Sequence, residues 1–525
     1  MYVYGNPSLR TALLLLGLAL AALPLGTGCG QARVAGSANA EQTTPGTDAK
    51  VSPTGKVLLP LVLTGSAGPL RVDPANPRYF ANGSGKIVYL TGSHTWANLQ
   101  DAGPANPPPA FDYAAYLDFL TANHHNFFRL WAWEQSRGVP EDADGATWFS
   151  PSAYRRTGPG NALDGGPRFD LTQFDQAYFD RMRERIVAAG SRGVYVSVML
   201  FNGWSVGQKP SNPGNPWPGH PFHRENNVNG VDGDPNQDGN GYEVQTLAVP
   251  AITALQEAYI RKVVDTVNDL DNVLYEICNE SNQGLGETEW QYHMIRYVKS
   301  YEASKPKQHP VGMTVAYPDG INADLLDGPA DWISPNAEGG FKDEPPAADG
   351  GKVSIVDSDH LWGEGGDREW VWKTFTRGHN VIYMDCYQAL YCGKYPPDDP
   401  TRLSVVKNLG YTLAYAERVN LAAMTPRPDL CSTGYCLANP VARGAEYLAY
   451  LPAGGSLTVD LSATKEGLAV EWFNPADGST VAGEAAVGGG ARSFRAPFGG
   501  DAVLYLRAAA AAPAGTCTSS PPASE

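Results

Sequence analysis

Near the middle of the chain lies an apolar run, Asn272-Val273-Leu274-Tyr275-Glu276-Ile277-Cys278, which ends in Asn279-Glu280-Ser281. A short, mainly apolar run of this kind indicates a strand buried on both faces. A carboxylate at the end of such a strand, beside an amide that can hold a sugar hydroxyl, is suited to protonating a glycosidic oxygen. Glu280 is therefore a candidate general acid. The chemistry also needs a second carboxylate, and Asp357, at the end of the apolar segment 353–356, is the first candidate.

Between about Leu70 and Leu430, short apolar segments alternate with amphipathic segments such as 178–189 and 254–270. This alternation predicts an α/β fold with parallel strands and crossover helices. The predicted strands are 87–90, 127–131, 194–200, 273–278, 311–315, 332–334, 353–356 and 381–384. Eight strands are the number that closes a (β/α)8 TIM barrel. An open doubly wound sheet stays an alternative, but it leaves the count unexplained, and the chain lacks the glycine-rich turn used for dinucleotides.

In a barrel of this kind, function is located at the carboxyl ends of the strands. Polar and aromatic residues follow every predicted strand, which favours a functional rim over the polar residues that begin any loop. In chain order they are His94, Trp96, Arg129, Trp133, Trp204, Asn279, Glu280, Tyr317, Asn336, Glu338, Asp357, Asp359, His360, Asp385 and Tyr387.

Three features of this set resemble the signature of the clan A glycoside hydrolases, the cellulase-like retaining barrels. They are Arg129 in Phe128-Arg129-Leu130-Trp131, the Asn-Glu pair that closes strand four, and the acidic residue that closes strand seven. The resemblance covers roughly residues 70–430. It implies that Glu280 is the general acid/base, that Asn279 binds the substrate 2-hydroxyl, that Arg129 steadies the nucleophile, and that the strand-seven carboxylate attacks the anomeric carbon. His94, Trp96 and Tyr317 would line the pocket.

The electrostatics of a retaining site agree with these roles. Two carboxyl groups about 5 to 5.5 Å apart are needed, one protonated and one ionised. Arg129 beside Asp357 would lower the pKa of Asp357, whereas a less polar setting would keep Glu280 protonated. Because aspartate is one methylene shorter than glutamate, the gap could instead admit a water and give an inverting reaction. Asp359, Glu338 and Glu364 are the alternative partners for Glu280.

A second constellation follows the third predicted strand, in the segment 232–243. Oxygen-bearing side chains stand at positions 1, 3, 5, 7 and 12 of this segment, as in an EF-hand-type calcium loop. Gln237 stands where that pattern has its glycine, so an ordinary Asx-rich turn is the alternative. The candidate ligands of a structural calcium ion are Asp232, Asp234, Asn236, Asp238 and Glu243. No cofactor is expected to be required for catalysis.

Composition and the N-terminus indicate an exported bacterial enzyme. The chain has 525 residues, 42% of them hydrophobic, and a net charge of -16, which with no Lys/Arg run disfavours nucleic acid as a partner. Residues 1–29 read as a signal peptide, because Arg10 precedes an apolar stretch too short to span a membrane comfortably. Cys29 resembles a lipobox cysteine, although Gly26 stands where an aliphatic residue belongs. The protein is therefore expected to be secreted or attached to the cell envelope, with a lipid anchor at Cys29 as its one membrane contact.

The seven cysteines suit an oxidising compartment. Cys386 with Cys392, and Cys431 with Cys436, are spaced to form pairs that close small loops. Cys278 is expected to be a buried thiol on its apolar strand.

After the barrel, the sequence pattern changes to short alternating strands broken by Gly and Pro. Segments 447–451, 456–461, 468–473 and 502–506 predict a small antiparallel β-sandwich. Tyr450 to Gly455, then Glu471 to Pro475, and a closing Asp501-Ala502-Val503-Leu504 resemble the C-terminal module named for collagen binding that follows such barrels. Packing against the barrel, or holding a glycan, stays open as its role.

The expected organisation is a signal peptide (1–29), a disordered linker (30–57), a catalytic barrel (58–435), a β-sandwich (436–508) and a disordered tail (509–525). The expected function is hydrolysis of O-glycosidic bonds in a polysaccharide or glycoconjugate, with Glu280 as acid/base and Asp357 as nucleophile. The alternative is a non-catalytic surface protein that binds glycans on a degenerate hydrolase barrel. Metal-dependent hydrolysis is a third reading.

Overall fold

The computed structural model describes residues 68–210, 212–282, 284, 286–385, 387 and 396–508. The predicted signal peptide, the Cys29 anchor, the linker, the Cys386–Cys392 pair and the C-terminal tail lie outside these residues. No helix among the described segments is both long and apolar enough to cross a membrane.

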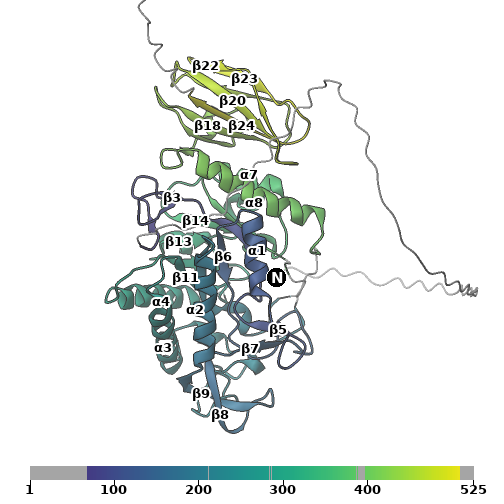
Figure 1. Ribbon diagram of the computed structural model, residues 1–525. Helices are drawn as coiled ribbons and strands as arrows, with labels where there is room; N and C mark the ends of the chain where they lie inside the picture. Colours follow the sequence, from purple (N-terminus) through teal and green to yellow (C-terminus); the bar gives the residue numbers. More distant parts are fainter. Residues whose placement is uncertain are drawn as a thin grey trace, which may run out of the picture. The chain divides into compact units, whose positions relative to one another are not determined.

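The larger part of the described chain is a (β/α)8 barrel, as predicted. Its eight parallel strands are β4 (Thr91–His94), β6 (Phe127–Leu130), β10 (Tyr195–Asn202), β11 (Val273–Asn279), β12 (Val311–Thr314), β13 (Trp332–Ser334), β14 (Val353–Asp357) and β15 (Asn380–Met384). They hydrogen-bond in the order β4-β15-β14-β13-β12-β11-β10-β6. The surrounding helices are α1 (Tyr113–Ala122), α2 (Gln176–Gly190), α3 (Pro250–Val267), α4 (Glu287–Glu302), α5 (Asn322–Asp327), α7 (Arg368–Thr376) and α8 (Pro400–Arg418) (Figure 1).

The two ends of this sheet, β4 and β6, meet and complete the ring. The Asn126 backbone N–H donates to the Thr91 carbonyl at 3.0 Å, and the Asn126 side-chain oxygen accepts from the Thr91 N–H at 2.9 Å. Gly92 permits this approach, because a Cβ at position 92 would lie 2.2 Å from the Phe127 carbonyl oxygen. A side chain at this position would therefore push the two strands apart.

The first barrel strand is not where the sequence pattern predicted it. Ile87–Val88 forms β3, which pairs antiparallel with β2 (Phe80–Ala81) in a separate small sheet that also contains β1 (Arg71–Val72). The barrel strand starts at Thr91. The prediction was wrong because Leu90 is buried in the cluster at the amino ends of the strands, with Phe127 and Leu274, so apolar residues precede the strand.

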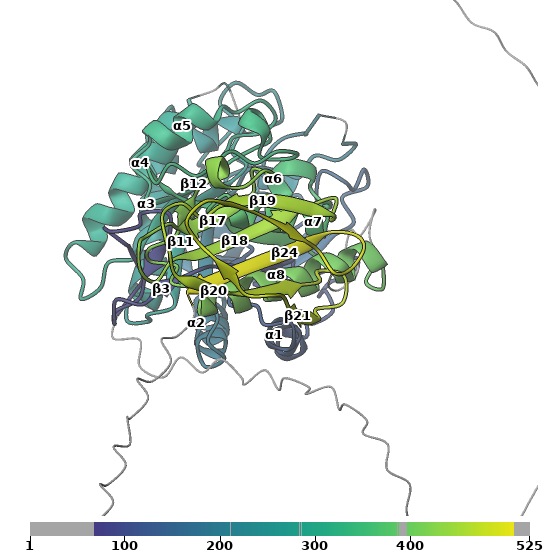
Figure 2. The same ribbon diagram turned by 90° about the horizontal axis from the view of Figure 1, so that it is seen from above.

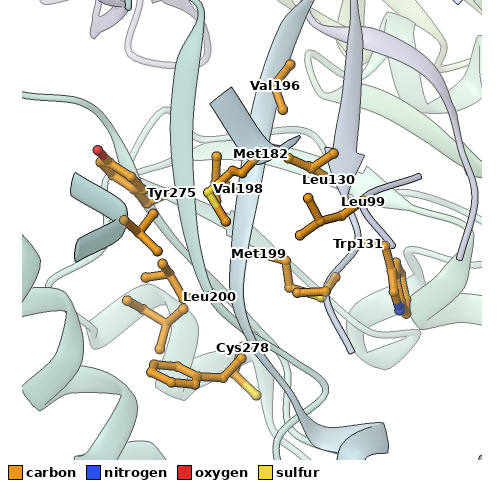
Figure 3. Packing of buried hydrophobic residues seen from close by; sticks show 14 of the residues in the cluster. Leu99, Leu130, Trp131, Met182, Val196, Val198, Met199, Leu200, Tyr275 and Cys278 are labelled. Atoms are coloured by element: carbon orange, nitrogen blue, oxygen red, sulfur yellow. The ribbon is translucent and has the colours of Figure 1, made fainter. Parts of the chain in front are cut away.

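The core between the barrel and its helices follows from the all-apolar strands. Every residue of β10 is buried, as expected for a parallel strand covered on both sides. Met182 of α2 packs beside Val198 and Leu130 in this core (Figure 3). Cys278 is fully buried there, and burial raises its thiol pKa well above the usual value, which confirms the predicted inert thiol.

Long connections at the carboxyl end of the barrel provide further structure. These connections contain two two-stranded sheets. In one, β5 (Asp101–Gly103) of the β4 connection pairs with β7 (Trp148–Ser150) of the β6 connection. In the other, β8 (Tyr154–Asn161) pairs with β9 (Pro167–Phe174) within the β6 connection. Short 3-10 turns η1 (Gly203–Ser205), η2 (Trp217–Gly219) and η3 (Tyr242–Gln245) shape the β10 connection, and η4 (Glu338–Gly340) follows β13. The short helix α6 (Asp359–Trp362) follows β14 directly.

The C-terminal strands are antiparallel, as predicted. One sheet has the order β16 (Thr425–Pro426), β17 (Cys436–Asn439), β18 (Glu446–Leu451), β24 (Ala502–Ala508), β20 (Gly467–Phe473) and β21 (Thr480–Ala482), with β22 (Ala486–Val487) on β20. Figure 2 shows β17, β18, β24 and β20 side by side. A second sheet pairs β19 (Ser456–Asp460) with β23 (Ala491–Arg495). Turn η5 (Pro428–Leu430) joins β16 to β17.

One face of the larger sheet packs against α7 and α8. The Trp372 ring of α7 stacks on Tyr450 with centroids 6.2 Å apart, and Phe473 packs between α7 and α8. Arg368 forms an ion pair with Asp501 at 2.7 Å. This aromatic face of the sheet therefore packs against the barrel, which is one of the roles that the sequence left open.

Cys431 and Cys436 are buried next to each other, as their spacing suggested. Both are free thiols in this structure, and a hydrogen bond between the two side chains helps raise the Cys436 pKa, together with burial. The predicted pairing is thus a contact rather than a covalent bond.

Candidate active site

A cleft of about 740 Å³ opens at the carboxyl ends of the barrel strands. Most of the rim residues predicted from the sequence line this cleft. Several residues that the sequence analysis did not single out line it as well. The predicted ones are Trp96, Trp133, Trp204, Asn279, Glu280, Tyr317, Asn336, Glu338, Asp359, His360 and Glu364; the additional ones include Trp131, Glu141, Lys342 and Trp362. His94, Arg129 and Asp357 do not reach the cleft wall and lie beneath it.

Glu280 is presented to the cleft by a strained backbone. Its φ of 42° is in the left-handed region, which non-glycine residues adopt only when their surroundings enforce it. The Thr314 hydroxyl accepts from the Glu280 N–H at 3.2 Å and donates to the Cys278 carbonyl at 2.5 Å, which fixes the turn. Gly203 leaves room for it, because a Cβ at position 203 would lie 1.8 Å from the Glu280 carbonyl oxygen.

The Glu280 carboxyl group is set up to hold a proton near neutral pH. Burial raises its pKa to about 7, against the opposing effects of a hydrogen bond from Trp204 and the charges of Lys209 and Arg129. The Trp204 indole N–H donates to Glu280 Oε2 at 2.6 Å, so this oxygen is the one held as acceptor. The other oxygen is left to carry the proton.

Arg129 organises the floor of the cleft. Its Nε donates to Glu276 at 2.8 Å, its Nη1 to Asp357 at 2.9 Å and to Asp359 at 3.3 Å, and its Nη2 to Asn279 Oδ1 at 2.7 Å. The guanidinium is 1% exposed and its pKa is raised because the carboxylates outweigh the effect of burial. Glu276 was missed from the sequence. A charged residue inside an otherwise apolar strand was the available signal, since buried carboxylates are expected to be paired.

Asp357, the predicted nucleophile, is fully enclosed. Both of its oxygens are engaged, by His94 Nε2 at 2.9 Å, by Arg129 at 2.9 Å and by the Asp359 backbone N–H at 3.0 Å. Burial alone would raise the Asp357 pKa, but the His94 charge and hydrogen bond and the Arg129 charge lower it well below the usual value. The group is therefore ionised, but it has no exposed surface from which to attack a sugar.

Asp359 lies two residues later, at the start of α6, and lines the cleft. Its side chain is 7% exposed. Burial and the nearby charges of Glu280 and Asp357 raise its pKa well above the usual value, while Arg129 opposes the shift. The carboxylate form of Asp359 therefore depends on its bond to Arg129.

Asn279 and His360 complete the wall between these carboxyl groups. Burial and the Arg129 charge lower the His360 pKa to about 3, so the ring is neutral. The His360 ring bonds Ser334 Oγ at 2.8 Å and Asn279 Oδ1 at 3.2 Å. Because Asn279 Oδ1 already accepts from Arg129, and its amide nitrogen donates one hydrogen to Asn202 Oδ1 at 3.5 Å, the second amide N–H is the group left to meet a substrate hydroxyl.

Ligand atoms of Asp357, Asp359 and His360 lie within 4.8 Å of one another. Arg129 bonds to both carboxylates, and the His94 ring bonds to Asp357, so protein side chains already engage the carboxylate oxygens that a metal ion would need. The arrangement fits an ion-pair network better than a metal centre.

The predicted calcium ligands lie together in one turn. Asp234 accepts from the backbone N–H groups of Asp238 and Gly239, at 3.2 and 2.9 Å. Asn236 bonds both Asp238 and Glu243, which brings position 12 of the loop back to position 5. Gln237 has a φ of 60°, so it adopts the left-handed conformation that glycine supplies at this position of an EF-hand loop.

Two family profiles match the chain. One, described as "Domain of unknown function (DUF6298)", matches residues 134–325. The other, described as "Putative collagen-binding domain of a collagenase", matches residues 435–507, which agrees with the predicted resemblance of the C-terminal module. No curated protein sequence matches this chain.

Solved structures resemble the chain over most of its length. A structure described as a glycoside hydrolase has a TM-score of 0.54 at 12% identity and covers 84% of this chain and 97% of its own. A family 5 glycoside hydrolase from Bacteroides vulgatus ATCC 8482 has a TM-score of 0.55 at 13% identity, with 84% and 94% covered. The chain has the fold of a glycoside hydrolase barrel. At such low identity the likeness confirms only the barrel fold that the sequence predicted. The roles of individual residues depend on the geometry described above.

Proposed function

We propose that this protein is a glycoside hydrolase that cleaves O-glycosidic bonds by a retaining mechanism. The observation that carries the proposal is that Glu280, whose pKa is raised to about 7, and Asp359, which Arg129 bonds, line one cleft at the catalytic end of the barrel. Glycoside hydrolysis needs one protonated and one ionised carboxyl group on either side of the scissile bond. The likeness to solved glycoside hydrolases supports the same reaction class.

Glu280 is the general acid/base in this proposal, and Asp359 replaces Asp357 as the nucleophile. Asp359 was one of the alternative partners named from the sequence, and it is the strand-seven aspartate with access to the cleft. Asp357 instead holds Arg129 and His94 in place beneath it. Arg129 then stabilises the ionised form of Asp359 through its 3.3 Å contact.

The reaction follows from these positions. Glu280 donates its proton to the leaving oxygen while an Asp359 oxygen attacks the anomeric carbon, which breaks the glycosidic bond and forms a glycosyl ester. Glu280, now a carboxylate, removes a proton from water, and the resulting nucleophile attacks the same carbon. The ester bond breaks, Asp359 is released as a carboxylate, and the product keeps the configuration of the substrate. Asn279 is placed to bind the 2-hydroxyl throughout.

The cleft walls favour a sugar as the substrate. Five tryptophans line it, and Trp204 and Tyr317 pack with ring centroids 5.4 Å apart beside Glu280. Aromatic faces bind the apolar faces of sugar rings while polar groups orient the hydroxyls. A carbohydrate is therefore the proposed partner. Export, and attachment through Cys29, are proposed on the sequence evidence above.

Turnover on a panel of aryl glycosides and polysaccharides tests the proposal. We expect release of the aryl group or of reducing ends from at least one sugar, and proton NMR of the fresh product should show the anomeric configuration of the substrate. An inverted product would make Asp359 a general base instead. Binding of a glycan without turnover would favour the alternative, a glycan-binding protein on a hydrolase barrel.

Calcium binding to the 232–243 loop is a separate prediction. Calcium should raise the melting temperature of the chelator-treated protein by a few degrees, since a ligand at about 100 times its Kd adds about 2.7 kcal/mol of stability. Magnesium, which prefers fewer protein ligands, should do less. Asp234→Ala should abolish the calcium effect, and the same response in this variant would contradict the site.

A further inference from the structure

A buried lysine lies beside the acid/base and has no role in the mechanism above. Lys209 follows η1 in the connection after β10, and only 3% of it is exposed. Its ammonium group donates to Asn282 Oδ1. Among the described residues, no carboxylate lies within the 4.0 Å that defines an ion pair with it.

Such a lysine is unusual, because a buried ammonium group normally has a carboxylate partner. Burial lowers the Lys209 pKa to about 8, and the Glu280 carboxylate acts in the opposite direction. At pH 7 the side chain therefore still carries most of a positive charge. Asn282 itself is held by Gln245, whose Oε1 accepts from the Asn282 amide at 2.8 Å, so the lysine is anchored at a fixed place.

Lys209 and Glu280 contact the same tryptophan. The Lys209 ammonium lies 5.9 Å from the Trp204 ring centroid, and the Trp204 indole N–H bonds Glu280 Oε2 at 2.6 Å. A cation over an aromatic face fixes the ring by electrostatic attraction. The lysine thus acts on Glu280 in two ways, through the orientation of Trp204 and through its own field.

We propose that Lys209 is a positioning residue that stabilises the carboxylate form of Glu280, so that one side chain can serve as acid in the first step and as base in the second. This inference rests on the proposed retaining mechanism. A group that must give up its proton and then act as a base needs a nearby positive charge once the proton has left, and Lys209, which packs on Trp204, provides it.

The other charges that face Glu280 do not replace this one. Arg129 lowers the Glu280 pKa, and Asp357 raises it. Glu280 raises the pKa of Asp359, and Tyr317 stays a neutral phenol because burial raises its pKa. Arg129 is shared among Glu276, Asp357 and Asp359, all of which it bonds directly. Lys209 also lowers the Glu280 pKa, and it has no direct carboxylate partner among the described residues.

Lys209→Met tests the proposal because it removes the charge and keeps the bulk. The Glu280 pKa should rise, so the alkaline limb of kcat/KM should move to higher pH by about one unit. With a dinitrophenyl glycoside, the dinitrophenolate leaves without a proton. The second step then limits turnover, and this step needs Glu280 as a base. There kcat should fall several-fold below pH 7, while kcat/KM changes little.

Lys352→Met is the matched control. Lys352 is a half-buried lysine whose pKa is also lowered by burial, but it precedes β14 at the amino end of the barrel and bonds the carbonyls of Gly328 and Ala330. The control should keep the wild-type pH profile. An equal shift in both variants, or no shift in Lys209→Met, would overturn the proposal.

Asn282→Asp keeps the test informative if Lys209→Met does not fold. The new carboxylate would accept from Lys209 at the same place and neutralise its field, so the alkaline limb should again move to higher pH. An unchanged limb in a folded Asn282→Asp protein would also overturn the proposal. Absence of any turnover in the wild-type protein would instead count against the proposed glycosidase function.

Discussion

Glu280→Gln should lower kcat/KM for a natural glycoside by about 10²- to 10⁴-fold, the usual contribution of a general acid. The amide keeps the size of the side chain but cannot donate a proton to the leaving oxygen. It also cannot take a proton from water in the second step. Steady-state rates on the sugar identified by the panel measure the loss, with thermal unfolding to confirm that the variant folds.

The leaving group provides an internal check on this result. A dinitrophenyl glycoside needs no proton to depart, so its kcat/KM should fall much less than that of the natural substrate. Glu141→Gln is the matched control, because Glu141 lines the same cleft but its carboxylate accepts a hydrogen bond from Asn212 rather than from Trp204 or Arg129. Similar losses in both variants, or a loss below tenfold in Glu280→Gln on the natural substrate, would contradict the acid/base role.

Most of the barrel could be predicted because its strands are covered on both faces. The runs that form β10 and β11 are almost wholly apolar and bounded by polar residues, so they stand out in the sequence. The first strand did not, because Thr91-Gly92-Ser93-His94 is polar and the apolar residues precede it. Its His94 side chain faces the ion pairs of the barrel interior, where it bonds Asp357, rather than an apolar layer.

The acid/base could be predicted for a related reason. Glu280 directly ends an apolar strand, so the strand and the function are marked by one motif. Asp357 also directly ends a strand and was preferred for the same reason, but the chain turns there into α6 and carries Asp359 to the cleft. Strand spacing shows which carboxylates lie near the mouth of a barrel. It does not show which of two neighbours is enclosed by His94 and Arg129.

Lys209 had no signal of its own in the sequence. It is a single lysine in a long connection rich in Pro, Gly and Asn, where an exposed side chain is the ordinary expectation. Its burial depends on Asn282 and Trp204, which come from other parts of the chain. Such long-range contacts are visible only once the fold is known.

Asp359 should carry the sugar in the glycosyl-enzyme intermediate. A 2-deoxy-2-fluoro glycoside with a good leaving group slows both steps but the second more, so the ester should accumulate as a mass increase on the intact protein. Trypsin should release residues 353–368, between Lys352 and Arg368, and this peptide contains Asp357, Asp359, Glu364 and Asp367. Fragmentation of the labelled peptide then assigns the sugar to one of the four side chains.

Variants of the two aspartates separate attack from support. Asp359→Gly and Asp357→Gly should both lose activity by orders of magnitude, since the second leaves Arg129 and His94 without their shared partner. Added azide should restore turnover in Asp359→Gly alone, because the space opened there faces the sugar, and should yield a glycosyl azide of inverted configuration. Azide enters the Asp357 site only beneath the cleft floor, where no anomeric carbon is within reach. A label on Asp357, or rescue of Asp357→Gly, would return the nucleophile to the residue that the sequence favoured.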